Sequence, residues 1–138
     1  MDTVYVNTHG NPMPEQHGDW IDLATAEYVD MEVGEFQLIS LGVSMRLPDD
    51  CYAMLVPRSS TFKKYGIIQA NSIGIVDNEY SGDEDIWMFA AYATRDVHIP
   101  KGTRICQFKV FSNEPHVKIA QVKSTGSVNR GGFGSTGD

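Results

Sequence analysis

The amino-acid sequence predicts an all-β fold with one short helix. Segments rich in Val, Ile, Phe and Tyr recur along the 138 residues, and clusters of Gly, Pro, Asn and Asp separate them. Apolar residues at helical spacing are scarce. This pattern is typical of β-sandwiches and barrels, and the chain length fits one domain.

The apolar segments predict the strands and one irregularity. Within the longest segment, Phe36 and Leu38 fall on one face, whereas Ile39 and alternate residues as far as Leu47 fall on the other. Such a change of face predicts a bulge or bend near Ile39. The predicted strands are residues 21–27, 35–47, 52–57, 67–70, 74–77, 86–93, 104–111 and 117–122.

A short helix is predicted over residues 60–65. Ser60 stands at its start, Lys63 and Lys64 lie in its last turn, and Gly66 follows it. These are the residue types that favour a helix N-cap, a helix C-terminus and a left-handed ending, respectively.

The composition argues against several classes of function. A net charge of −7 disfavours nucleic-acid binding, which normally requires a basic surface. No apolar run approaches the roughly 20 residues that cross a bilayer, and the N-terminus lacks a secretory signal. Cys51 and Cys106 show no metal-site or redox spacing. We therefore expect a cytoplasmic protein with reduced thiols and with neither nucleic acid nor a membrane as a partner.

The last nine residues, 130–138, combine four glycines with one arginine and one phenylalanine. Such a segment has too little apolar surface to fold alone, but its backbone N–H groups can converge on a phosphate. Arg130 can bind phosphate oxygens, the hydroxyls of Ser135 and Thr136 can donate to them, and Phe133 can stack on a base. The alternative is a disordered polar tail. We predict a folded domain over residues 1–123 and an arm over residues 124–138.

Further candidate groups lie inside the predicted domain. Arg58, Ser59 and Ser60 lead into the short helix and can bind an anion there, or they form an ordinary helix start with a surface arginine. Gln107 is an amide on an otherwise apolar strand, where it can also simply face solvent. Asp22, on an early strand, can orient metal-bound water or pair with an arginine.

Residues 74–82 read as a strand, a tight turn and a return. Asp77 ends the apolar strand and is therefore a candidate general base for a water molecule. The alternative is a turn aspartate that accepts a hydrogen bond from its own backbone.

The order and spacing of these groups resemble the trimeric deoxyuridine triphosphate nucleotidohydrolases (dUTPases), above all those of Gram-positive bacteria and their phages. The five motifs of that family match residues 22–23, 57–60, 71–82, 102–107 and 130–137. The resemblance implies a distorted jelly-roll-like β-barrel, a homotrimer in which C-terminal arms close over neighbouring sites, and Mg²⁺-dependent hydrolysis of dUTP to dUMP and pyrophosphate.

The resemblance also implies a role for each residue. Asp77 activates the attacking water, and Asp22 contacts Mg²⁺ through water. The hairpin reads uracil, Tyr80 packs on the deoxyribose, and Phe133 covers the base. The implied substrate-binding residues are Arg58, Ser59, Ser60, Asn71, Gly74, Ile75, Val76, Tyr80, Gln107, Arg130, Phe133, Gly134, Ser135 and Thr136.

Two alternatives remain open. A dCTP deaminase or dCTPase of the same fold shares this architecture, although the hairpin over residues 74–80 favours uracil. A phage regulatory protein that binds a host repressor is the other alternative, and such a partner can coexist with catalysis.

Overall fold

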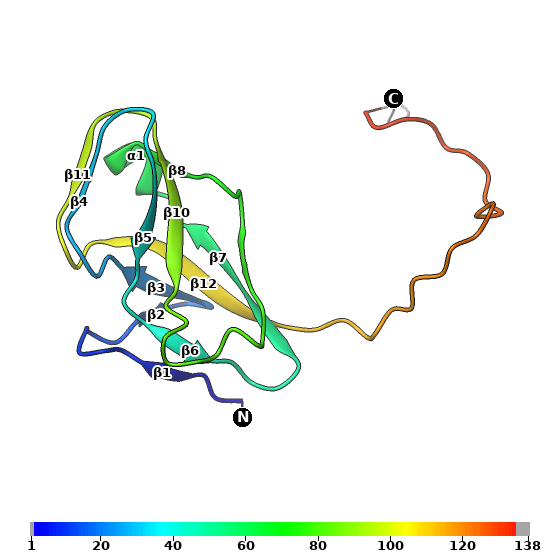
Figure 1. Cartoon of the computed structure of the whole chain (residues 1–138), viewed down its shortest axis with the longest axis horizontal. Coiled ribbons are helices and arrows are strands. Elements are labelled where there is room, and N and C mark those ends of the chain that lie inside the picture. Colours follow the sequence, from blue (N-terminus) through cyan, green and yellow to red (C-terminus); the bar gives the residue numbers. More distant parts are fainter. Residues whose placement is uncertain (1, 135–138) are drawn as a thin grey trace.

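The structure is a computed structural model that describes residues 2–134. Its largest sheet has the strand order β2 (Glu15–His17), β3 (Trp20–Ala24), β12 (Arg104–Ser112), β7 (Cys51–Pro57) and β9 (Gly74–Val76). All neighbouring strands in this sheet are antiparallel. The long strands β7 and β12 form its centre (Figure 1).

Three smaller antiparallel sheets complete the domain. They comprise β5 (Phe36–Ser40), β10 (Met88–Ala93) and β8 (Ile67–Gln69); β11 (Val97–Ile99) and β4 (Val29–Met31); and β1 (Tyr5–Asn7) and β6 (Ser44–Arg46). The predicted all-β fold with one short helix is confirmed, but no sheet in the described part of the chain closes into a barrel. Strands β1, β2, β4 and β11 were not predicted. At three residues each, they lack the pair of adjacent apolar residues between turn residues that marked β8 and β9, or the chain around them is too polar to give a pattern.

The hydrophobic core lies between the sheets. The largest buried side chains include Trp87, Phe89 and Phe108. In β10, buried Phe89, Ala91 and Ala93 alternate with exposed Met88 and Tyr92. This period of two is expected for a strand with one face on the core.

The prediction of one strand over residues 35–47 is wrong. The segment forms β5 and β6, which belong to different sheets. The chain changes direction at Gly42, where φ is +69° and a Cβ atom would lie 2.5 Å from Asn11 Nδ2. The predicted faces are nevertheless confirmed, because Phe36 and Leu38 are exposed and Ile39 is fully buried. The bend lies later than Ile39, since only glycine fits both the positive φ and the close packing.

The short helix is α1 (Thr61–Tyr65). It ends at Gly66 as predicted, with φ +66° and an N–H that donates to the Phe62 carbonyl. Ser60 makes no side-chain capping bond. Instead, the Thr61 hydroxyl accepts the Arg58 N–H at 3.0 Å and donates to the Ile105 carbonyl at 2.6 Å, which ties the helix to β12. Within residues 2–134 there is no helix long and apolar enough to span a membrane.

The predicted strand over residues 117–122 is also wrong. After β12 the chain leaves the domain and runs away from it (Figure 1). Residues 113–134 contain no strand, and their side chains are exposed. The physical reason is that a strand needs a neighbouring strand to satisfy its backbone groups, and here none lies alongside.

Candidate active site

Five charged or titratable side chains meet on β2, β3, β12 and the residue that follows β7. We call Glu15, His17, Asp22, Arg58 and Arg104 the charge cluster. Asp22 lies at its centre and is only 4% exposed. The strand register explains the meeting, because Glu15 pairs with Asp22 and Asp22 pairs with Gln107.

A β-bulge adds Arg104 to this group. The register between β12 and β3 shifts between Arg104 and Cys106. Their partners, Ala24 and Leu23, are adjacent on β3, so Ile105 is an extra residue on β12. An extra residue reverses the alternation of side chains along a strand. Arg104 therefore shares a face with Gln107 and Asp22, whereas simple alternation would have placed it on the opposite face. The Thr61 hydroxyl that accepts the Arg58 N–H donates to the Ile105 carbonyl, so the helix start stabilises the bulge.

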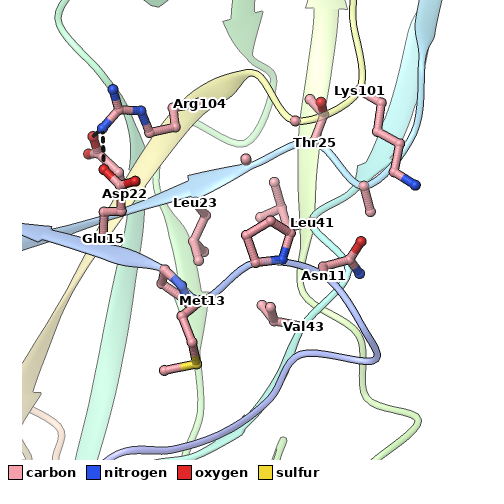
Figure 2. A pocket seen from close by; sticks show the side chains of 15 residues that line it. Asn11, Met13, Glu15, Asp22, Leu23, Thr25, Leu41, Val43, Lys101 and Arg104 are labelled. Carbon is pink, nitrogen blue, oxygen red and sulfur yellow. Dashed lines mark hydrogen bonds and ion pairs between the residues drawn. The ribbon is translucent and has the colours of Figure 1, made fainter.

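The contacts within the charge cluster are short. Asp22 Oδ2 lies 3.3 Å from Arg58 Nε and 3.5 Å from Arg104 Nη1. Arg104 Nη1 also donates to Glu15 Oε2 at 2.8 Å and lies 2.9 Å from His17 Nε2. Figure 2 shows the guanidinium of Arg104 facing the adjacent carboxylates of Glu15 and Asp22. These side chains line a cavity of about 260 Å³. The cluster can therefore hold two arginines in place for an anion.

Arg58 is the arginine best placed for a ligand. Its Nη1 donates to the Arg104 carbonyl at 3.3 Å, while 30% of its side chain is exposed. A fixed guanidinium with a free edge can bind a phosphate through two parallel hydrogen bonds. Ser59 is exposed at the start of α1, Ser60 follows it, and Gln107 donates to the Pro57 carbonyl at 3.3 Å. The structure thus brings together Asp22, Arg58 and Gln107, three of the predicted site residues, and adds Glu15, His17 and Arg104 beside them.

The second group is a hairpin built on β9. Gly74 pairs with Leu55 and Val76 pairs with Ala53 of β7. The Asn78 amide donates to the carbonyls of Pro48 and Cys51 at 2.7 and 2.9 Å, which holds the turn against the domain. Asp77 Oδ2 accepts the Glu79 N–H at 3.1 Å. Asp77 is exposed, so its other carboxylate oxygen can still contact a ligand or water.

A cavity of about 320 Å³ lies against this hairpin. Its size is in the range of small-molecule sites. Six predicted residues line it: Asn71, Gly74, Ile75, Val76, Asp77 and Tyr80. Sequence reasoning missed the remaining lining residues, Leu55, Ile86, Trp87 and Met88, because they lie on other elements and carry no chemical signal of their own.

Tyr80 closes one side of the cavity. Its hydroxyl donates to the Ile86 carbonyl at 2.7 Å. Burial, and secondarily the negative charge of Asp85, raises the pKa of Tyr80 above the ordinary value of 10.0. The hydroxyl therefore stays protonated at neutral pH and keeps its hydrogen bond to Ile86.

The two groups lie at opposite ends of β7. Asp77 follows Val76, which pairs with Ala53 near the start of the strand, and Arg58 follows its last residue, Pro57. At roughly 3.3 Å per residue, the separation is about 20 Å. Arg130, Phe133 and Gly134 lie exposed on the segment that leaves the domain, and Ser135 and Thr136 lie outside the described residues. Among residues 2–134, a single chain does not bring the predicted site residues of the hairpin, the charge cluster and the C-terminal segment together.

No ready-made metal centre is present among residues 2–134, since no three His, Cys, Asp or Glu side chains are grouped to hold an ion. The Asp22 carboxylate, the predicted outer-sphere contact, is occupied by Arg58 and Arg104. A site with so few carboxylate ligands suits a metal ion that is held mainly by the substrate. Mg²⁺ bound to a nucleoside triphosphate is such an ion, because phosphate oxygens and water complete its coordination shell.

Comparisons with known proteins show the family to which the chain belongs. A family model described as dUTPase matches residues 13–137. The chain is 52% identical over 122 residues to the SPbeta prophage-derived deoxyuridine 5'-triphosphate nucleotidohydrolase of Bacillus subtilis, across 88% of this chain and 86% of that protein. It is 35% identical over 137 residues to the deoxyuridine 5'-triphosphate nucleotidohydrolase of Rickettsia prowazekii, across 95% and 91% of the two chains.

Solved structures share the fold. The dUTPase of Streptococcus mutans superposes with a TM-score of 0.73 at 21% identity and covers 83% of this chain and 98% of its own. A mutant dUTPase of Staphylococcus bacteriophage 80alpha with dUpNHpp superposes with a TM-score of 0.81 at 22% identity and covers 98% of both chains. Because the family model spans nearly the whole chain and a relative of similar length is 52% identical, this chain belongs to the dUTPase family.

Proposed function

We propose that the chain hydrolyses dUTP to dUMP and pyrophosphate. The observation that carries this proposal is the position of Asp77, an exposed carboxylate on the lining of a base-sized cavity. A water held by its free oxygen attacks the α-phosphorus and gives its proton to Asp77. The bond between the α-phosphorus and the bridging oxygen breaks, and pyrophosphate leaves. A general base must lie within one hydrogen bond of the water it activates.

The hairpin is proposed to select the base. The backbone of Gly74 lies at the cavity, and the Asn71 amide offers a donor and an acceptor there. A tight wall excludes the thymine methyl group, and cytosine leaves backbone groups unpaired, which gives strong discrimination. Tyr80 is proposed to pack on the deoxyribose, where a 2′-hydroxyl would clash.

Arg58 of the charge cluster is proposed to hold the triphosphate together with its neighbours Ser59, Ser60 and Gln107. Asp22 acts chiefly by fixing the two guanidinium groups, and one of its oxygens can also reach the water shell of Mg²⁺. When bound, Mg²⁺ neutralises charge on the phosphates. Activity is therefore expected to depend on Mg²⁺.

We further propose that each active site is shared between chains of a homotrimer. An attacking water must lie within about 3.5 Å of the phosphorus, whereas Asp77 and Arg58 of one chain lie at opposite ends of β7. A site made from the hairpin of one chain and the charge cluster of another removes this conflict. The exposed residues Arg130, Phe133 and Gly134, together with Ser135 and Thr136, would then come from an arm of a neighbouring chain.

An exposed apolar face supports association between chains. On the outer side of the sheet β5-β10-β8, Leu38 pairs with Ala90, and Tyr92 pairs with both Phe36 and Ile68. Phe36 and Leu38 are 58% and 56% exposed. Contiguous apolar surface of this kind marks protein interfaces. Met88, on the same face, also lines the base cavity, so a second copy seated on this face would lie beside the active site.

Complementation between two inactive variants tests the shared site directly. Asp77→Asn and Arg58→Ala chains are coexpressed, and pyrophosphate release from dUTP with Mg²⁺ is measured. If sites are shared, mixed trimers contain some sites with both native residues, and activity returns. Activity that does not return, although sedimentation shows mixed trimers, places both residues in one chain's site and contradicts the proposal.

The substrate is tested with dUTP, dCTP, dTTP and UTP in parallel. We expect turnover of dUTP alone. Release of ammonia or pyrophosphate from dCTP would instead support the related dCTP enzymes.

A further inference from the structure

Two buried polar atoms beside the base cavity have no hydrogen-bond partner. Among residues 2–134, Gln69 Oε1 and Trp87 Nε1 are the buried side-chain nitrogen and oxygen atoms in this condition. One is an acceptor and the other a donor. Buried polar groups are almost always paired, and each exception costs stability, so each requires a physical reason.

Gln69 packs directly against the hairpin. It is 7% exposed at the end of β8, and its Nε2 donates to the Leu55 carbonyl at 3.0 Å. Leu55 is the residue that pairs with Gly74. A Cβ atom on Gly74 would lie 3.1 Å from Gln69 Nε2 and 3.2 Å from Leu55 Cβ. The Gln69 amide therefore occupies the space beside Gly74 and limits how far β9 can approach β7.

Trp87 forms another part of the wall. It is 1% exposed and lines the same cavity as Leu55 and Gly74. Its ring contacts Phe108 edge to face, with ring centroids 5.0 Å apart. Its backbone N–H donates to the Val43 carbonyl at 2.9 Å. Trp87 is thus held by its backbone and by the contact of its ring with Phe108, while its indole N–H has no partner.

We propose that Gln69 and Trp87 are positioning residues for base selection. The Gln69 amide sets the position of Gly74. The unpaired Gln69 oxygen and the unpaired Trp87 N–H are an acceptor and a donor behind the cavity wall, and each gains a partner when a uracil nucleotide fills the cavity and the wall adjusts. Neither residue contacts the reacting phosphorus. The inference rests on the proposed hydrolysis of dUTP and extends it to residues behind the base.

The indole N–H signal in NMR tests this inference without relying on turnover. The chain has two tryptophans, Trp20 and Trp87, so ¹⁵N labelling gives two indole signals, which Trp20→Phe assigns. Saturating dUMP is expected to shift the Trp87 signal and to leave the signal of Trp20, which lies on β3, nearly unchanged. In Gln69→Met the shift is expected to be much smaller. An unmoved Trp87 signal, or an equal shift in both proteins, overturns the inference.

Kinetics give the second readout. Gln69→Met and Trp87→Phe are each expected to raise KM for dUTP by about tenfold, with a smaller change in kcat, and to narrow the preference for dUTP over dTTP. Because both residues support the same cavity wall, the rise in KM of the double variant is expected to be smaller than the product of the two single rises. The matched control is Gln37→Met, because Gln37 and Gln69 both pair with Ala91 from opposite sides. Gln37→Met should retain native kinetics.

The outcomes separate this inference from the proposed function. A wild-type protein that does not hydrolyse dUTP contradicts the proposed function. An active wild type whose Gln69→Met and Trp87→Phe variants keep native KM and native selectivity overturns only the positioning role. A purely structural role is recognised by equal losses of kcat for all substrates with no change in selectivity. If Gln69→Met does not fold, the KM and the substrate selectivity of Trp87→Phe alone test the positioning role.

Discussion

The charge cluster and the base hairpin are built on different physical principles, although β7 connects them. The cluster depends on side-chain charges that are already paired without a ligand, with Asp22 buried under Arg58 and Arg104. The hairpin depends on backbone pairing and close packing around Gly74. Salt and charge changes should therefore affect the cluster most, whereas small changes of volume should affect the hairpin most. The substitutions that follow test this difference.

The largest effect is expected for Asp77→Asn, which removes the proposed base from the hairpin. Turnover should fall by about 10²–10⁴-fold, the usual contribution of a general base. Nucleotide binding should persist, because Asp77 is exposed and the Asn78 contacts that hold the turn remain. Pyrophosphate release and calorimetric titration with dUMP measure the two quantities. Glu79→Gln, on the same turn, serves as the control, and complete loss of binding in Asp77→Asn would give Asp77 a structural role.

The next effect is expected for Arg58→Ala in the charge cluster. Removing one partner of a buried carboxylate costs about 2–5 kcal/mol in affinity or stability. Because Arg58 is partly exposed, we expect the lower part of this range, seen as a higher KM for dUTP and a lower denaturation midpoint. The difference between Arg58→Ala and the native protein should become smaller at high salt, because salt also weakens the charge contacts of the native protein. Arg46→Ala, whose guanidinium lies over the Tyr5 ring, is the matched control. Equal losses in both variants would contradict a specific role for Arg58.

Gly74→Ala tests the packing of the hairpin. The added methyl group would lie 3.1 Å from Gln69 Nε2 and 3.2 Å from Leu55 Cβ, and overpacking of this kind costs about 1–3 kcal/mol. We expect a higher KM for dUTP with little dependence on salt, in contrast to Arg58→Ala. KM and kcat measured at two salt concentrations test this expectation. A rise in KM that depends strongly on salt would contradict a packing effect at Gly74.

Asn78→Ala should have a smaller effect. It removes two donors to the carbonyls of Pro48 and Cys51, and such hydrogen bonds contribute about 0.5–1.5 kcal/mol each. Urea unfolding should show the loss of stability, and kcat should fall because Asp77 is less well fixed. Unchanged kcat despite lower stability would show that this turn does not position the carboxylate.

The smallest effect concerns Tyr80 and appears only at alkaline pH. Its pKa in the folded protein is raised above 10.0 by burial and then by Asp85. The stability contributed by the protonated hydroxyl is therefore complete below pH 10.0 and is lost as the pH rises through the folded-state pKa. Tyr80→Phe should lack this alkaline loss. Urea unfolding at pH 8 and above pH 10 compares the two proteins, and identical pH profiles would contradict the assignment.

Much of this molecule could be predicted from local pattern. Alternation of apolar residues correctly identified most of the long strands and the faces of Phe36 and Leu38. Turn chemistry correctly ended α1 at Gly66. The strand predicted over residues 117–122 failed because alternation records apolar spacing, whereas a strand also needs a partner for its backbone, which the same chain does not provide here.

In the candidate site too, local features could be predicted from the sequence, whereas contacts between distant segments could not. Asp77, Asn71 and Tyr80 stand close together in the sequence, so their meeting at one cavity could be expected. Arg104 could not be assigned to the face of Asp22, because a bulge at Ile105 reverses the side-chain alternation. Gln69 and Trp87 carry no motif, and only their burial beside Gly74 reveals them.

The sequence by itself determined the all-β character, the acidic net charge, the hairpin around Asp77 and the glycine-rich end, because each follows from residue types at short spacing. Only the tertiary structure decided that the Asp22 carboxylate lies under two arginines, that Gly74 rests against Gln69, and that Asp77 and Arg58 lie at opposite ends of β7. These relations depend on register and packing between segments far apart in the chain, where a shift of one residue reverses every face.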